Sequence, residues 1–130
     1  MVRSKRANEN VRLLRVGENL RHALAEILAR EEVPEPALKG RSITVSAVEV
    51  SPDLRHADVY VLPLLGENSD AVLPALNRQA GAFQRALGRR IRLKYIPRPA
   101  FKLDPSFAEA DRIESLLKSE KVRRDLDDGD

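Results

Sequence analysis

The sequence predicts an α+β fold in which helices cover one face of a three-stranded sheet. Two segments, residues 8–31 and 75–87, carry apolar residues at the three- and four-residue spacing of an amphipathic helix. Residues 43–50, 57–65 and 91–103 alternate apolar with polar residues or are rich in β-branched ones, which is typical of half-exposed strands. A chain of 130 residues suffices for one domain, so these elements are expected to share one core.

The first helix is expected to start at Asn8 or Asn10, because either side chain can cap it, and to end near Glu31. Its apolar stripe, expected in the core, consists of Leu13, Val16, Leu20, Leu24, Ile27 and Leu28. Gly17 lies inside this helix, where glycine costs about 1 kcal/mol relative to alanine and can mark close packing. Residues 1–7 are basic and show no periodicity, so they are expected to form a flexible arm.

Two strands joined by a short turn are expected to form an antiparallel hairpin. The alternation of residues 43–50 slips between Ala47 and Val48, which a β-bulge explains. The SPDL sequence at residues 51–54 is typical of a turn, because its serine and aspartate can bond local backbone groups and its proline restricts φ. Residues 57–65 then supply the second strand.

The second helical segment is expected to begin near Leu73, with Pro74 at its first position, or one turn earlier at Ser69, and to end at Gly88. One side of it is apolar and is expected in the core: Leu76, Ala80, Phe83 and Leu87. The roughly opposite side carries Arg78, Arg85 and Arg89. Gly81 lies between these arginines and has no side chain, so the middle of the basic face is expected to be a depression where an anion can bind.

A third strand is expected to start at Ile91 and to lie at the edge of the sheet. Its odd positions are mostly apolar, with Ile91, Leu93, Tyr95, Phe101 and Leu103. Its even positions are cationic, with Arg92, Lys94, Arg98 and Lys102. Pro97 and Pro99 lack N–H groups on the same side of the strand, so that side cannot be fully paired with a neighbour.

The C-terminal part is expected to hold a short helix and a charged tail. The sequence from Ser106 to Glu109 fits a capping box. Apolar residues of this helix are available to pack on the body: Phe107, Ile113, Leu116 and Leu117. Residues 118–130 carry charge without a core-forming pattern and are expected to be disordered, which leaves residues 8–117 as the domain.

The composition argues against enzymatic chemistry and metal binding. The absence of cysteine excludes disulfides, thiol catalysis and cysteine–zinc sites. The glycines are too scattered for a P-loop or dinucleotide fingerprint, and the two histidines, His22 and His56, lack a metal-binding spacing. We therefore expect no catalytic residue, metal, cofactor or small-molecule substrate. Because no stretch resembles a signal peptide or a membrane span of about 20 apolar residues, we expect a cytoplasmic protein without membrane contact.

The charges are arranged in blocks along the chain. Residues 78–102 contain eight lysines and arginines and no carboxylate, whereas residues 31–77 contain three basic and eight acidic residues. A polarised surface of this kind attracts polyanions such as nucleic acids. Only five aromatic residues occur, mostly at core positions, so contacts to RNA phosphates are expected rather than a base-stacking platform. Alternatively, some of these arginines pair with the acidic block at 31–77, and charge alone does not exclude DNA.

Three stretches resemble the bacterial ribosome-binding factor A family: RVGENLRHALAEILARE in the first helix, VEVSPDLRHADVYV across the hairpin and LGRRIRLKYIPRPAFKLDPSFAEADRIESLL after the second helix. The resemblance covers residues 11–117. It implies a KH-like (type II) domain with αββααβ order and a kinked second helical segment. It also implies a non-catalytic factor that binds the small ribosomal subunit and its 16S rRNA during late maturation, with links to rRNA processing at the 5′ end and to cold adaptation.

In that family the helical segment is kinked at an Ala-x-Gly element, and the matching residues here are Gln79, Ala80 and Gly81. Gln79 stands where the family has a small residue, which leaves the geometry of the kink open. RNA contacts are expected from Arg78, Gly81, Arg85, Arg89, Arg90, Arg92 and Lys94. Secondary contacts are expected from Arg3, Lys5, Arg6, Arg12 and Arg15. We expect a monomer, and the alternative functions are a free-standing KH-like RNA-binding regulator or a protein-interaction adaptor that uses the acidic hairpin or the free strand edge.

Overall fold

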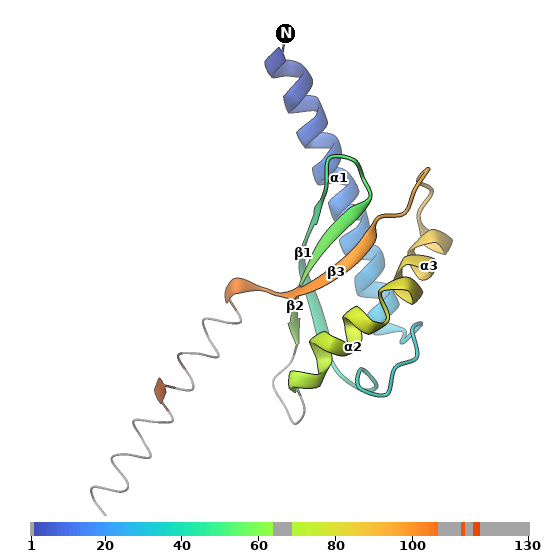
Figure 1. The fold of residues 1–130 in the computed structure, drawn as a ribbon, viewed down its shortest axis with the longest axis vertical. Coiled ribbons are helices and arrows are strands. Elements are labelled where there is room, and N and C mark those ends of the chain that lie inside the picture. Colours follow the sequence, from blue (N-terminus) through green and yellow to red (C-terminus); the bar gives the residue numbers. More distant parts are fainter. Residues whose placement is uncertain (1, 64–68, 107–112, 114–115, 118–130) are drawn as a thin grey trace, which may run out of the picture.

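A computed structural model of the chain describes residues 2–63, 69–106, 113 and 116–117. The elements follow one another as helix, two strands, two helices and a strand, which confirms the predicted order. They are α1 (Val2–Ala29), β1 (Ile43–Val50), β2 (His56–Pro63), the short 3-10 helix η1 (Ser69–Ala71), α2 (Val72–Arg78), α3 (Ala80–Arg90) and β3 (Arg98–Leu103). Figure 1 shows α1 crossing behind the sheet and extending past the turn between β1 and β2.

The sheet has the strand order β1-β2-β3, so β3 lies at an edge as predicted. The pairing of β1 with β2 is antiparallel, and that of β2 with β3 is parallel. The register of the hairpin shifts between Val45 and Ala47, which leaves Ser46 as the extra residue of a β-bulge. The expected bulge is therefore present, slightly before the slip in the sequence pattern.

The core lies between the sheet and the helices. On β2 the buried residues Ala57, Val59 and Val61 alternate with half-buried ones, so one face of the strand points toward the helices. The predicted helical stripes are confirmed at the residues nearest the sheet, which are Leu20, Leu24, Ile27, Leu76, Ala80, Phe83 and Leu87. The rings of Phe83 and Phe101 meet at 5.0 Å between centroids and join α3 to β3.

Gly17 lies where α1 packs closely against β1. A Cβ atom built on this glycine would lie 2.6 Å from the carbonyl oxygen of Val48. Real Cβ atoms essentially never come that close to a backbone oxygen, so the packing of α1 on the hairpin requires glycine at this position. The close packing that the sequence left as one interpretation of Gly17 is thus present.

Helix α1 starts earlier than the sequence predicted. It begins at Val2 rather than at Asn8 or Asn10, so residues 2–7 continue the helix and do not form a separate arm. The segment before Gly17 contains no proline or other glycine, and its lysine, arginine, alanine and leucine residues are good helix formers. None of the helices in the described ranges combines the length and apolar character that crossing a bilayer requires.

Helix α3 and strand β3 also differ from their predicted limits. Gly88 does not end α3, because the helix continues to Arg90 and the N–H of Ile91 still donates to the carbonyl of Leu87. The strand begins at Arg98, and residues 91–97 form a loop. The physical reason is the parallel pairing with β2, whose first residue, His56, lies opposite Arg98. Residues before Arg98 pass the end of β2 and have no strand to pair with.

The segment after β3 is capped by Asp104 rather than by Ser106. Asp104 Oδ1 accepts the Ser106 N–H at 2.8 Å, and Pro105 takes the first helical position. Phe107, the rest of the predicted capping box and residues 118–130 lie outside the described residues. Ile113, Leu116 and Leu117 are more than half exposed, so the expectation that they pack on the body is wrong. Helices α1, α2 and α3 already fill the core face of the sheet.

Candidate nucleic-acid interface

The predicted kink lies at Gln79, the single residue between α2 and α3. Its φ of −99° and ψ of 18° depart from helical values, and its N–H is shared between the carbonyls of Ala75 and Leu76. Its own carbonyl accepts the Phe83 N–H at 3.0 Å and starts α3. Ala80 is 4% exposed, so only a small side chain fits directly after the kink.

The side chain of Gln79 is held by Glu35, which belongs to the loop between α1 and β1. Gln79 Nε2 donates to Glu35 Oε2 at 2.9 Å, and Arg78 Nη2 donates to Glu35 Oε1 at 2.5 Å. The Glu35 side chain is only 9% exposed. A glutamine is therefore accommodated at the kink because its amide points toward this loop and finds a carboxylate there. The pattern of the sequence contained no signal for Glu35, which lies more than 40 residues earlier in the chain.

The contacts of Glu35 make the stability of this junction depend on pH. Hydrogen bonds from Gln79 and then from Arg78 hold the pKa of Glu35 below its usual value of 4.5. Because the pKa is lower in the folded state, the stabilisation is complete above pH 4.5 and is lost as the pH falls through the folded-state pKa. Glu35→Gln is expected to lower the melting temperature at neutral pH, and the difference from the wild type is expected to shrink as the pH falls below 4.5.

Thermal unfolding followed by circular dichroism across this pH range measures that effect. Glu9→Gln is the matched control, because Glu9 is exposed and makes no hydrogen bond or ion pair among the described residues. A difference between Glu35→Gln and the wild type that stays constant with pH would contradict the proposed role of the carboxylate.

Two of the predicted RNA contacts are engaged in ion pairs within the protein. Arg78 pairs with Glu35, and Arg90 pairs with Glu26 at 2.6 Å and with Glu32 at closer range. These contacts raise the pKa of Arg90, chiefly through the hydrogen bond to Glu32. Both arginines therefore pair with acidic residues of the chain, which was the alternative to RNA binding. Arg90 also connects α3 to α1 and to the loop after α1.

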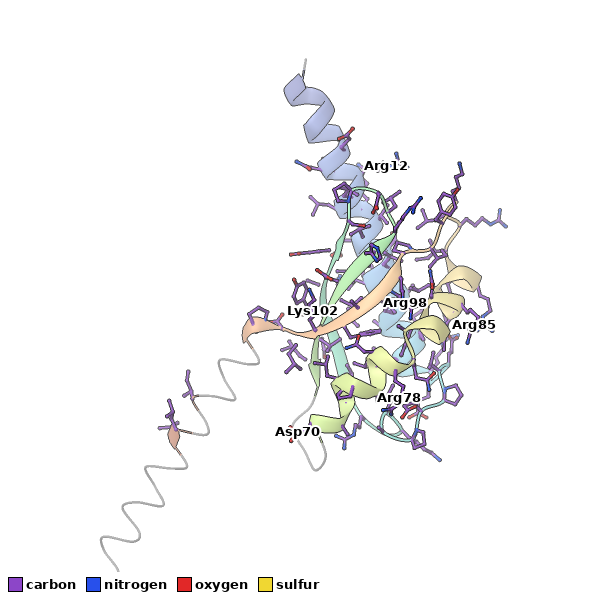
Figure 2. All side chains as sticks on the ribbon, in the orientation of Figure 1. Arg12, Asp70, Arg78, Arg85, Arg98 and Lys102 are labelled. Carbon is purple, nitrogen blue, oxygen red and sulfur yellow. The ribbon has the colours of Figure 1, made fainter. Side chains whose placement is uncertain are left out.

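The remaining predicted contacts are exposed: Arg85, Arg89, Arg92 and Lys94. Arg85 and Arg92 form no ion pair with any described residue. The pKa of Glu32 is lowered chiefly by the hydrogen bond from Arg90, and Arg89 makes a smaller contribution through its charge. The Lys94 ammonium lies 5.5 Å from the centre of the Tyr95 ring. We call these four residues the α3 cationic surface. Figure 2 shows Arg85 pointing outward from α3, with Arg78 on the same side of the molecule.

A Cβ atom at Gly81 would touch only the end of the Arg85 side chain, at 3.8 Å, so the fold itself does not require glycine here. The secondary residues lie apart on α1, where Arg12 and Arg15 are exposed. Figure 2 shows Arg12 on the part of this helix that extends beyond the sheet. For Arg3, Lys5 and Arg6 the structure gives the helical backbone of α1.

The free edge of β3 is partly covered by a residue that the sequence prediction did not include. Asn77 Nδ2 donates to the Phe101 carbonyl at 3.0 Å, and the Phe101 N–H donates to Asn77 Oδ1 at 2.7 Å. The side-chain amide of α2 thus pairs with the strand as a neighbouring strand would. The neighbouring Pro99 has no N–H to offer on this side. The feature of the sequence that could have drawn attention to Asn77 is the L-N-x-x-x-G pattern of residues 76–81, to which it belongs.

Within the described residues, no group of three or more histidine and carboxylate side chains is arranged to hold a metal ion. The arrangement instead combines exposed guanidinium groups with backbone held rigidly by side-chain hydrogen bonds. Guanidinium groups bind phosphate with two parallel hydrogen bonds, so the α3 cationic surface is suited to a phosphate backbone.

Comparisons with known proteins agree with this geometry. The family model "Ribosome-binding factor A" matches residues 12–117. The ribosome-binding factor A of Novosphingobium aromaticivorans is 50% identical over 119 residues, covering 92% of this chain and 88% of that protein. That of Phenylobacterium zucineum is 52% identical over 115 residues, covering 88% and 79%.

Solved structures give the same assignment. The crystal structure of ribosome-binding factor A from Thermus thermophilus has a TM-score of 0.59 at 31% identity, covering 70% of this chain and 93% of that chain. A homology model of the T. thermophilus factor, fitted into a cryo-EM map of a 30S complex of that factor, has a TM-score of 0.53 at 34% identity, covering 65% and 86%. The shared α-β-β-α-α-β order confirms the KH-like fold. This chain belongs to the ribosome-binding factor A family.

Proposed function

We propose that this protein binds the small ribosomal subunit through its 16S rRNA and assists late maturation of the subunit without catalysing a reaction. The observation that carries the proposal is the α3 cationic surface, where Arg85 and Arg92 are exposed and form no ion pair with described residues. Membership of the family supports the partner, because the T. thermophilus factor has been fitted into a 30S complex. Further steps of the proposal are a role in processing the 5′ end of the rRNA and in growth at low temperature.

Binding takes place mainly through phosphates. Four exposed cations are grouped on α3 and the loop after it, next to a kink that Glu35 holds in place. Each phosphate neutralised by a cation releases bound counterions, so affinity is expected to fall steeply with salt. With about four contacts, the slope of log K against log salt concentration is expected near −3.

Cosedimentation tests the proposal. The protein is expected to sediment with isolated small subunits and to be absent from mature whole ribosomes, with binding lost on nuclease treatment. Equal binding to any structured RNA would instead favour a free-standing RNA-binding regulator. Binding that resists both salt and nuclease would favour a protein-interaction adaptor. Because the Asn77 side chain covers part of the β3 edge, a partner strand would have less free edge to pair with.

A further inference from the structure

The loop at residues 91–97 is anchored at both ends and presents its tip to solvent. At its start, the Ile91 N–H donates to the Leu87 carbonyl at 2.9 Å. At its end, Gln84 Nε2 donates to the Ile96 carbonyl at 2.7 Å, and Pro97 is buried. Ile96 also packs over α3 at Gly88, where an added Cβ would lie 3.6 Å from its side chain. The two ends of the loop are therefore held in place, and its tip lies between them.

Tyr95 lies at this tip with its ring largely in solvent. It is 63% exposed, whereas Phe83 and Phe101 are buried and Tyr60 is half-buried in the sheet. The Lys94 ammonium lies 5.5 Å from the centre of the Tyr95 ring. A ring that lies mostly in solvent beside a cation can stack on a nucleobase, as aromatic side chains in the basic grooves of single-strand-binding proteins do.

A polar hollow adjoins the same loop. It has a volume of about 760 Å³ and lies between α1 and the end of α3, lined by Asn19, His22, Ala23, Glu26 and residues 90–93. Glu26 is paired with Arg90, so its charge is compensated, while Arg92 forms no ion pair with a described residue. A phosphate group in the hollow can therefore be bound by Arg92 on one wall and by hydrogen-bonding side chains of α1 on the other.

We propose that Tyr95 stacks on one unpaired base of the rRNA, while the adjoining phosphate lies in the hollow beside Arg92. This inference rests on the proposed RNA-binding function and names the form of RNA that is bound, a single-stranded segment. A base within a duplex presents no free face to an aromatic side chain, whereas an unpaired base can stack on it. The site supplements the phosphate contacts of the α3 cationic surface with one base contact.

Tyrosine fluorescence tests the stacking directly. The chain has two tyrosines and no tryptophan, so Tyr60→Phe leaves Tyr95 as the only strong emitter. Its emission, corrected for absorption by the RNA, is expected to be quenched by a single-stranded oligoadenylate of about eight nucleotides. An abasic strand of the same length and a duplex are expected to quench it little. Equal quenching by the abasic strand would overturn the proposal.

Affinity measurements separate this inference from the proposed function. Tyr95→Ala is expected to weaken binding of the oligoadenylate about tenfold, Tyr95→Phe less than about twofold, and neither to change binding of the abasic strand. If the wild type binds small subunits but Tyr95→Ala changes neither quenching nor affinity, the stacking site fails alone. If the wild type does not bind small subunits while the tyrosine effects remain, the ribosomal function fails and the stacking site stands.

Discussion

Replacing Arg85 and Arg89 together by alanine is expected to weaken binding to the small subunit about a hundredfold. Each guanidinium is expected to contribute a hydrogen bond to a charged group, worth about 1.5–3 kcal/mol, and a hundredfold loss, about 2.8 kcal/mol, corresponds to the lower end of this range for two such bonds. The slope of log K against log salt should also become shallower by about 2, because two fewer counterions are released. Filter binding with purified small subunits over a range of salt concentrations measures both.

The melting temperature should stay the same in this double variant. Both side chains are exposed on α3, and Arg85 forms no ion pair with a described residue. The control is Lys39→Ala with Arg55→Ala, which removes the same charge from exposed positions in the two loops that flank β1. Unchanged binding in the Arg85/Arg89 variant would count against the α3 cationic surface. An equal loss in the control would mean that net charge, and not this surface, governs binding.

Gly17→Ala is expected to destabilise the fold, although alanine is the better helix former. On helix propensity alone this change would stabilise the protein by about 1 kcal/mol. The new methyl group would lie 2.6 Å from the Val48 carbonyl oxygen, and because that oxygen is backbone, α1 or β1 must move. Overpacking of this kind costs about 1–3 kcal/mol, so after the gain in helix propensity the net loss of stability is up to about 2 kcal/mol, and the melting temperature is expected to fall by up to about 8 °C.

Gly88→Ala is the matched control for that prediction. Gly88 also lies inside a helix, but its added Cβ would meet the Ile96 side chain at 3.6 Å, an ordinary van der Waals contact. This variant is expected to be as stable as the wild type or more stable, by up to about 1 kcal/mol. If Gly17→Ala raised the melting temperature as Gly88→Ala does, the close packing of α1 on β1 would not be required.

The sequence by itself determined which elements form, their order and which of their faces are buried. Leu20, Leu24 and Ile27 on α1, and Leu76, Phe83 and Leu87 further on, lie in the core as their spacing predicted. These properties can be predicted from the sequence because the apolar periodicity of a helix or strand is local. It repeats within one helical turn or one pair of strand residues. The prolines placed β3 at an edge for the same reason, since each lacks a local N–H group.

The tertiary structure alone decided where β3 begins and which arginines remain available to a ligand. The start of β3 is set by His56 of β2, and Arg78 and Arg90 are engaged by carboxylates that lie 43 to 64 residues earlier in the chain. A block of charge in the sequence records how many cations there are but not which of them meet a carboxylate. That depends on distances of a few ångströms between elements far apart in the chain, since the attraction between charges falls with separation and is weakened by water. Among the predicted RNA contacts with described side chains, Arg78 and Arg90 are engaged in this way, whereas Arg85 and Arg92 are exposed and form no ion pair with a described residue.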